Sequence, residues 1–175
     1  FRSGDKYTLT EDESKHCIKV LRLSLNDTVF LIDGKGGLCK ARIIDNHHKR
    51  CTVEVFEKQH DNKKRNYYLH IGIAPTKSIA RFEWFLEKAT EIGIDEITPF
   101  VGFHSERKTI KPPRLQKIIV SALKQSLQTY CPKLNEIVSF TDFMQKAGHF
   151  SGDKFIAHCA ENGKKTQLKD ACKSK

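Results

Sequence analysis

The sequence predicts an α/β protein with an N-terminal all-β domain, in which a small β-barrel precedes a domain built on a parallel sheet. Residues 28–58 hold three short runs rich in β-forming residues, separated by turns. From residue 67 onward, apolar runs alternate with amphipathic helical segments, the order typical of βαβ units. Residues 59–66 are polar and basic without periodicity, which indicates a linker. We therefore expect domains at 1–62 and 67–175.

The first predicted element is a short helix. Thr10 and Glu13 have the Thr-x-x-Glu spacing of a capping box, which satisfies backbone donors at the start of a helix. In the segment EDESKHCIKVLRL that follows, Cys17, Val20 and Leu21 are spaced to share one face.

Three strands are predicted next, at residues 28–32, 38–44 and 50–58, forming a small antiparallel sheet that curls into a barrel. The turn DGKGG joins the first two. A glycine-rich loop can bind phosphate where it leads from a strand into a helix, but here a strand follows. We therefore expect Gly34, Gly36 and Gly37 to supply positive φ angles in a hairpin.

The second domain is predicted to begin with a strand at residues 67–73 and a helix after it. The strand is a nearly continuous apolar run, as expected where both faces are covered. Gly93 is the expected end of the helix, and residues 94–101 supply another strand. The buried stripe of this helix is predicted to be Phe82, Phe85, Leu86 and Ala89.

A long amphipathic helix follows, and then two more strands are expected at residues 134–140 and 154–159, separated by 141–150. The apolar side of the long helix is predicted to hold Leu115, Ile118, Ile119, Ala122, Leu123, Ser126 and Leu127.

Two basic segments are predicted at the carboxyl ends of neighbouring strands, where parallel sheets bind ligands. Lys77 lies in the first, and it is either a solvated loop lysine or a ligand for an anion. Two cationic loops at one edge favour an extended anionic partner. The second segment carries His104, Arg107, Lys108, Lys111, Arg114 and Lys117.

Composition narrows the class of protein. The formal charge of +10 comes from 31 Lys and Arg against 21 Asp and Glu, and it favours polyanions such as nucleic acid as partners. The absence of a signal-peptide core suggests a cytoplasmic location. The cysteines are scattered without a Cys-x-x-Cys pair and are expected to be reduced. His47, His48 and Cys51 do not have the spacing of a zinc site, so no metal is expected.

These motifs resemble the bacterial small-subunit ribosomal RNA uridine-N3 methyltransferases of the SPOUT superfamily. The resemblance rests on HCIKVLRL and DGKGG in the first domain, and on APTKSIARFEWFLEKATEIGIDEITPF, SERK and SALKQSLQTYCPKL in the second. It implies a PUA-like β-barrel for RNA, then a SPOUT methyltransferase domain tied in a trefoil knot and paired as a homodimer. The implied reaction transfers a methyl group from S-adenosyl-L-methionine to N3 of a uridine in 16S ribosomal RNA of the small ribosomal subunit, without a metal.

The resemblance also assigns individual residues. His16 and Arg22 match an H-x-x-x-V-L-R signature, Lys77 a P-K position, and Gln125 an E-Q-S motif whose glutamate is replaced by Lys124. The RNA-binding residues we expect are His16, Arg22, Lys77, Arg107, Lys108, Arg114 and Gln125.

The carboxyl end departs from the family pattern. After Glu161 the sequence lacks the G-P-E-G-G and L-R-x-E-T-A segments that form the knot and hold the cofactor in the family. We therefore expect the methyltransferase domain to be incomplete and these 175 residues to be inactive without further sequence. His158 and Glu161, at the end of the last predicted strand, are the expected cofactor neighbours in this chain.

No general base is assigned. Glu83, Glu87 and Glu91 recur at four-residue spacing, which is typical of the solvated face of a helix. Two other functions stay open beside methylation. One is a noncatalytic RNA-binding module, and the other is a phosphate-binding α/β enzyme that acts on a small anion.

Overall fold

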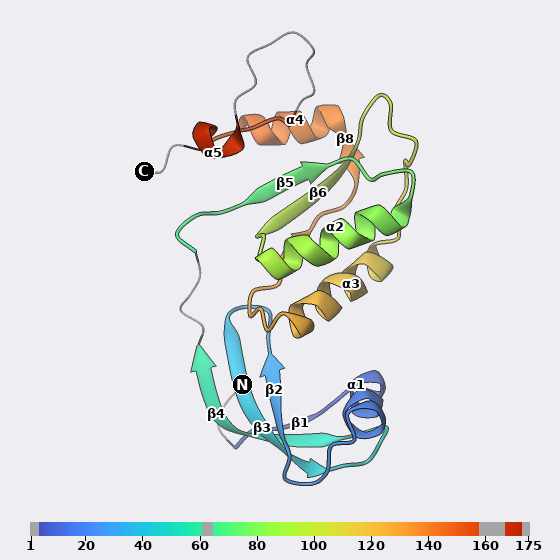
Figure 1. The fold of residues 1–175 in the computed structure, drawn as a ribbon, viewed down its shortest axis with the longest axis vertical. Coiled ribbons are helices and arrows are strands. Elements are labelled where there is room, and N and C mark those ends of the chain that lie inside the picture. Colours follow the sequence, from blue (N-terminus) through green and yellow to red (C-terminus); the bar gives the residue numbers. More distant parts are fainter. Residues whose placement is uncertain (1–3, 61–64, 158–166, 173–175) are drawn as a thin grey trace.

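The computed structural model describes residues 4–60, 65–157 and 167–172, and these contain two separate four-stranded sheets. The first sheet lies at one end of an elongated molecule and the second at the other (Figure 1). The first is antiparallel and the second is parallel, as the sequence predicts.

The first sheet has the order β1-β4-β3-β2. Its strands are β1 (Lys6–Thr8), β2 (Thr28–Ile32), β3 (Gly37–Asp45) and β4 (Thr52–His60). Apolar residues alternate with polar ones along β3 and β4, so the apolar side chains lie on one face of the sheet and form its core. That core consists of Cys39, Ala41, Ile43, Cys51, Val53 and Val55.

The three predicted strands of this sheet are confirmed, but β3 and β4 begin and end one or two residues away from the predicted bounds. β4 continues to His60 and so includes the first two residues of the predicted linker, because they pair with the start of β3. β1 was not predicted, since three residues are too few to display a period. Register shifts after Lys40 and Ile43 disrupt the ladder and curl the sheet. Within the described residues, β1 and β2 are the edge strands of this sheet.

The predicted first helix is confirmed at its start. Helix α1 (Glu11–Lys15) is capped by Thr10, whose hydroxyl accepts a hydrogen bond from the backbone N–H of Glu13 at 3.4 Å. The chain then changes to a π-helical turn, η1 (His16–Val20). Wider winding of this kind rotates later side chains away from their α-helical positions.

The predicted apolar face of this helix is therefore only partly correct. Cys17 is buried, whereas Val20 and Leu21 are 65% and 54% exposed. Ile18 and Leu23 pack against the core of the first sheet instead. The α-helical spacing used for the prediction does not hold across η1, and this explains the error.

The DGKGG turn is a hairpin, as predicted, but only two of its three glycines need a left-handed backbone. Gly34 and Gly36 have φ angles of 73° and 95°. Gly37 does not have a positive φ; it is required for space, because a Cβ there would collide with the Asp33 carboxylate. That carboxylate accepts hydrogen bonds from the N–H groups of Lys35 and Gly37 at 2.7 and 2.8 Å.

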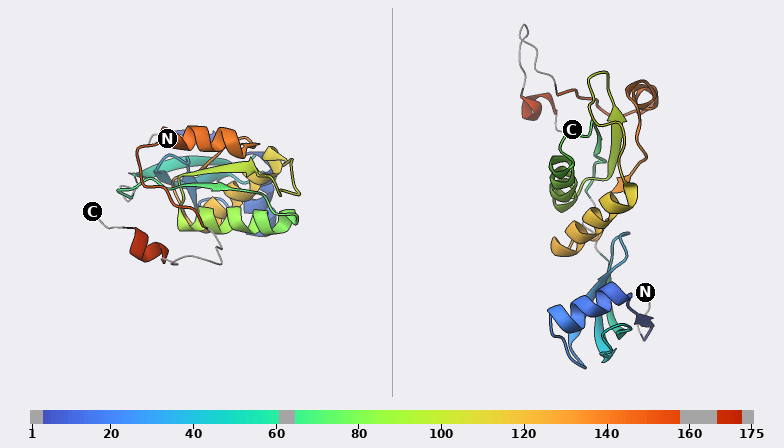
Figure 2. Two further views of the ribbon diagram at one scale, coloured as in Figure 1. Left: turned by 90° about the horizontal axis from the view of Figure 1, so that it is seen from above. Right: turned by 90° about the vertical axis from the view of Figure 1, so that its right-hand side faces the viewer.

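The second sheet places β6 between its partners. Its strands are β5 (His70–Ile73), β6 (Glu96–Val101), β7 (Lys133–Leu134) and β8 (Val138–Ser139). Helices α2 (Ile79–Ile92) and α3 (Pro112–Gln125) cover one face, and α4 (Phe140–Gly148) covers the other (Figures 1 and 2). A short helix, α5 (Leu168–Ala171), is described near the carboxyl end.

The predicted helical stripes form the core beneath α2 and α3. In α2, Phe82, Leu86 and Ala89 are buried, and Gly93 ends the helix with a φ of 89°. Phe85 packs against the same core. In α3 the buried residues are Leu115, Ile119, Ala122 and Leu123, with Ile118 half-buried.

The prediction for the end of α3 is wrong. Ser126 and Leu127 lie beyond the helix, and Leu127 is 66% exposed with a φ of 53°. The Ser126 hydroxyl instead donates to the carbonyl of Ala122 at 2.7 Å. The chain turns here, so helical spacing no longer describes which side chains point inward.

The strands of the second domain differ from the prediction at several points. β5 begins at His70 and β6 at Glu96, because the preceding residues bond to one another outside the ladder. The predicted strand 134–140 is divided into β7 and β8, both of which pair with β6. Residues 154–157 belong to no strand in the described structure, and the rest of that predicted strand lies outside it. Phe155 and Ile156 are exposed, so this apolar run lacks the covering layers of a parallel strand.

The two sheets are joined by the tip of the β2–β3 hairpin. The N–H of Gly36 donates to the carbonyl of Thr129 at 2.9 Å, and the N–H of Cys131 donates to the carbonyl of Gly34 at 2.8 Å. An ion pair between Glu13 of α1 and Lys124 of α3 adds a second connection. The lysine that replaces the family's glutamate at position 124 therefore links the two parts of the chain.

Candidate functional site

The carboxyl ends of β5 and β6 bring two loops to one edge of the second sheet. β5 ends at Ile73 and β6 at Val101, and the two strands are adjacent and parallel. Residues 74–78 and 102–111 follow them, and we call these two loops together the carboxyl rim (Figure 1). The predicted meeting of two basic loops at one edge is thus confirmed.

Arg107 fastens the two loops of the carboxyl rim together. Its Nε donates to the carbonyl of Thr76 at 3.1 Å, and its Nη2 donates to the carbonyl of Lys77 at 2.6 Å. A planar guanidinium suits such a two-point contact, which lysine cannot reproduce. The sequence predicts a direct contact to RNA for Arg107, and this stays a prediction; the two bonds add that Arg107 holds the backbone of Lys77.

The three residues of the SER motif, Ser105, Glu106 and Arg107, make different contacts. The Ser105 hydroxyl accepts a hydrogen bond from the N–H of Gly102 at 2.9 Å and so closes the turn after β6. Glu106 forms an ion pair of 2.9 Å with Lys77. Arg107 holds the facing loop. Each residue therefore helps to define where Lys77 lies.

The Lys77–Glu106 ion pair is open to solvent. The two side chains are 82% and 60% exposed, and ion pairs of this kind contribute little net stability. An incoming phosphate can therefore take the place of Glu106 at low cost. The pair lies at a polar cavity of about 260 Å³, lined by Lys77, Glu106, Arg107, Lys108 and Thr109.

An exposed aromatic ring also belongs to the carboxyl rim. The side chain of Phe103 is 98% exposed and meets the ring of His104 edge-on, with 4.9 Å between centroids. The sequence analysis did not single out Phe103. A phenylalanine inside a cationic loop is the signal that could have identified it, because bases stack on such rings.

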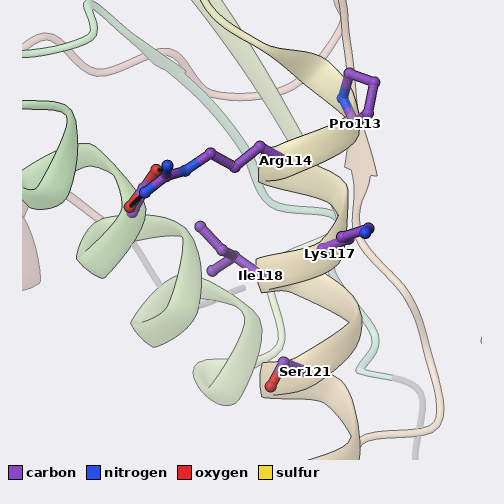
Figure 3. A pocket seen from close by; sticks show the side chains of 6 residues that line it. Pro113, Arg114, Lys117, Ile118 and Ser121 are labelled. Atoms are coloured by element: carbon purple, nitrogen blue, oxygen red, sulfur yellow. Dashed lines mark hydrogen bonds and ion pairs between the residues drawn. The ribbon is translucent and has the colours of Figure 1, made fainter. Parts of the chain in front are cut away.

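Arg114 does not join the carboxyl rim but links α3 to α2. Its side chain extends from α3 toward α2 (Figure 3). Its guanidinium forms two bonds to the carboxylate of Glu83, at 2.5 and 3.0 Å. The Glu83 side chain is only 15% exposed, so the predicted solvated face is wrong at this position, whereas Glu87 and Glu91 pair with Lys88 at the surface. The adjoining groove of about 550 Å³ is lined by Glu83, Pro113, Arg114, Lys117, Ile118 and Ser121.

Three other predicted RNA-binding residues lie away from the carboxyl rim. Gln125 is exposed at the far end of α3, whose 14 residues span about 20 Å. Lys124 beside it pairs with Glu13 of the first domain. His16 and Arg22 are exposed on the first domain, and Arg22 has a left-handed φ of 57° where the π-helical turn ends. Of the predicted RNA-binding residues, only Lys77, Arg107 and Lys108 therefore lie in the carboxyl rim.

The predicted cofactor neighbours, His158 and Glu161, lie outside the described residues.

Glu96, at the start of β6, has a carboxylate that accepts several hydrogen bonds. Burial raises its pKa, but hydrogen bonds from Asn135, Tyr68 and Lys133 outweigh this effect and lower it to about 2. A carboxylate with so low a pKa is a weak base at neutral pH, so Glu96 is poorly suited to remove a proton.

The described part of the chain has neither a cluster of metal ligands nor a helix that could span a membrane. Within residues 4–60, 65–157 and 167–172, no group of three His, Cys, Asp or Glu side chains could hold a metal ion. No helix there is both long and apolar enough to cross a membrane. The cysteines described, at positions 17, 39, 51, 131 and 172, are free thiols.

Comparison with known proteins agrees with this architecture. Residues 62–175 match the family model described as an RNA methyltransferase domain, and residues 9–56 match the model described as an RNA methyltransferase PUA domain. A Ribosomal RNA small subunit methyltransferase E from Mesomycoplasma hyopneumoniae is 31% identical over 138 residues, which are 76% of this chain and 58% of the relative. The chain spans 54% of the corresponding protein of Buchnera aphidicola, to which it is 28% identical over 74% of its own length.

Solved structures share the fold. A probable rRNA-methyltransferase from Porphyromonas gingivalis is 38% identical, with a TM-score of 0.73 over 78% of this chain and 58% of that one. A methyltransferase E from Neisseria gonorrhoeae bound to S-adenosyl methionine has a TM-score of 0.70 at 24% identity, covering 83% of this chain and 61% of that one. The predicted fold class, a PUA-like domain followed by a parallel α/β domain, is confirmed. With both of its parts matched in order, the chain belongs to the RNA methyltransferase family.

Proposed function

We propose that the chain serves S-adenosyl-L-methionine-dependent methylation of a uridine at N3 in 16S ribosomal RNA of the small ribosomal subunit. In this proposal residues 1–62 are a PUA-like RNA-binding domain and residues 67–175 belong to the methyltransferase domain. The protein works as a cytoplasmic homodimer. The family match and the ribosomal RNA methyltransferases among its relatives support the reaction class.

The carboxyl rim carries the proposal. Arg107 holds the loop of Lys77 in place through two backbone carbonyls, while Lys77 itself remains 82% exposed. Lys108 is exposed in the facing loop. Two exposed cations on braced loops suit the phosphates on either side of a target nucleotide, because such contacts position nucleic acid without reading its sequence.

The chemistry requires an accessible base. N3 lies on the pairing edge of uracil, so the target uridine must be unpaired or drawn out of its stack. Holding the flanking phosphates aligns N3 with the methyl donor, and alignment of this kind supplies much of the rate in bimolecular displacements. Phe103 is placed to stack on a base beside the held phosphates.

The residues of the carboxyl rim do not by themselves fit the cofactor. Its cavity of about 260 Å³ is lined by charged and polar side chains, whereas sites for molecules of this size are mostly apolar. S-adenosylmethionine would supply the methyl group when bound. In the proposal the rim therefore holds RNA, and His158 and Glu161 remain the candidates for contact with the cofactor.

The test is methylation of 16S ribosomal RNA by the protein extended past Lys175, read as reverse-transcription stops, because a methyl group at N3 blocks base pairing. Lys77→Ala and Lys108→Ala should reduce the stop at low RNA concentration. Lys146→Ala, which removes an exposed lysine from α4, should not. Absence of any N3 product from the extended protein would contradict the proposal. Salt-dependent RNA binding without product would favour the noncatalytic RNA-binding module.

A further inference from the structure

The outer face of the first sheet carries two exposed phenylalanines on either side of a basic strand. The inner face is the buried core, against which Ile18 and Leu23 pack. On the outer face Phe30 of β2 is 54% exposed and Phe56 of β4 is 43% exposed. β3 lies between these strands.

Phe56 faces outward by alternation with the buried Val53 and Val55, and a β-bulge leaves it unpaired and brings Glu57 to the same face. Lys40 pairs with Glu57, and the next residue of β3, Ala41, pairs with Val55, so Phe56 has no partner in the ladder. An extra residue of this kind lets two consecutive side chains point to the same side. Val55 thus stays in the core while Phe56 and Glu57 both face outward.

The cations of β3 lie between the two rings. Phe30 is directly opposite Lys40 in the sheet register. The guanidinium carbon of Arg42 lies 5.6 Å from the centre of the Phe56 ring. Because neighbouring strands are about 4.8 Å apart, the backbones that carry the two rings are separated by about 10 Å.

Acidic side chains only partly balance these cations. Lys40 forms an ion pair of 2.8 Å with Glu57, but both side chains are at least one-third exposed. Exposed pairs of this kind are weak, so a phosphate can displace the carboxylate. Single exposed phenylalanines are common on protein surfaces and need no explanation. Two of them flanking one basic strand form a more specific arrangement.

We infer that this face, defined by Phe30, Lys40, Arg42 and Phe56, is a stacking platform for an unpaired segment of RNA. Bases stack on the two rings, and phosphates bind Lys40 and Arg42. Aromatic rings combined with cations are the general solution for binding single strands without sequence preference. The inference rests on the proposed function only in taking RNA as the occupant. It adds a second contact surface, on the first domain and separate from the carboxyl rim.

The test uses a short labelled oligouridylate and measures its affinity for the 175-residue chain at several salt concentrations. Phe30→Leu and Phe56→Leu keep an apolar side chain but lose the ring, and each should weaken binding about fivefold or more. The slope of log affinity against log salt should not change, since no phosphate contact is lost. Arg42→Gln should instead make that slope shallower by about 0.7.

The controls separate stacking from misfolding. Phe30→Tyr and Phe56→Tyr retain a ring and should bind like the original chain. Phe155→Leu removes an equally exposed ring from the second domain and should have no effect. An abasic oligonucleotide of the same length should bind equally to the original chain and to the leucine variants, because it has no bases to stack.

Several results would overturn the inference. If the leucine variants unfolded at the same temperature as the original chain and bound oligouridylate with unchanged affinity, a stacking role would be excluded. If the leucine variants lost self-association in sedimentation but kept their RNA affinity, the face would be identified as a contact between two copies of the chain. If the original chain bound no oligouridylate, this inference would fail, whereas the proposed function would still be decided by methylation with the extended protein. If only Lys77 and Lys108 variants lost affinity, this inference alone would fail.

Discussion

Replacing Arg107 by lysine tests whether the carboxyl rim depends on a braced loop or only on charge. Lysine keeps the positive charge but carries all its donors on one nitrogen, so it cannot hold the carbonyls of Thr76 and Lys77 with the fixed fork of Nε and Nη2. Each of these exposed, charge-assisted bonds contributes about 1 kcal/mol, so the two stabilise the ordered loop by about 2 kcal/mol. If RNA binds only the ordered loop, affinity should fall by up to about 30-fold.

The assay is fluorescence anisotropy of a 16S ribosomal RNA fragment over a range of salt, combined with amide exchange. Arg107→Lys should lower the affinity at every salt concentration without changing the slope, and it should speed exchange at the amides of residues 76–78. Lys108→Ala is the matched comparison, because it should make the slope shallower and leave exchange unchanged. A shallower slope for Arg107→Lys, with unchanged exchange, would refute the bracing role and restore a direct phosphate contact.

Three further predictions concern other parts of the structure. Because the pKa of Glu96 is lowered to about 2 in the folded chain, its ionised carboxylate stabilises the fold at pH values above the unfolded pKa. This stabilisation is lost as pH falls from about 4.5 to 2. Glu96→Gln should remove up to about 3 kcal/mol of this acid dependence in urea unfolding at stepped pH; an unchanged pH profile would contradict the hydrogen-bond network. Gly36→Val forces a side chain against Tyr130 at a positive φ and should cost about 1–3 kcal/mol in thermal unfolding. Gly148→Ala, with open space around it, is the control and should be neutral. Calorimetry should detect weak or no S-adenosylmethionine binding to residues 1–175, and tight binding would refute this expectation. In the extended protein, Lys77→Ala should impair RNA methylation more than cofactor affinity. A Lys77→Ala protein that lost cofactor binding but kept RNA binding would refute that role.

The sequence by itself determined the order of most strands and helices from residue 28 to α3, and most of the core. Phe82, Leu86 and Ala89 recur at helical spacing and are buried, and Gly93 ends their helix as predicted. Such features are local, because the period of apolar residues reports which side of an element faces away from water. The same reasoning located both basic loops, since each follows a predicted parallel strand.

Tertiary structure alone decided what the charged and aromatic side chains of those elements contact. Arg107 and Lys77 are 30 residues apart in the chain, and Arg114 and Glu83 are 31 apart, so no local period connects them. Glu57 shares the outer face with Phe56 and meets Lys40 because β4 carries one more residue than β3 at the bulge, which depends on strand register. Periodicity records burial within one element, whereas hydrogen bonds, ion pairs and bulges depend on how separate elements meet, and only the folded chain brings those elements together.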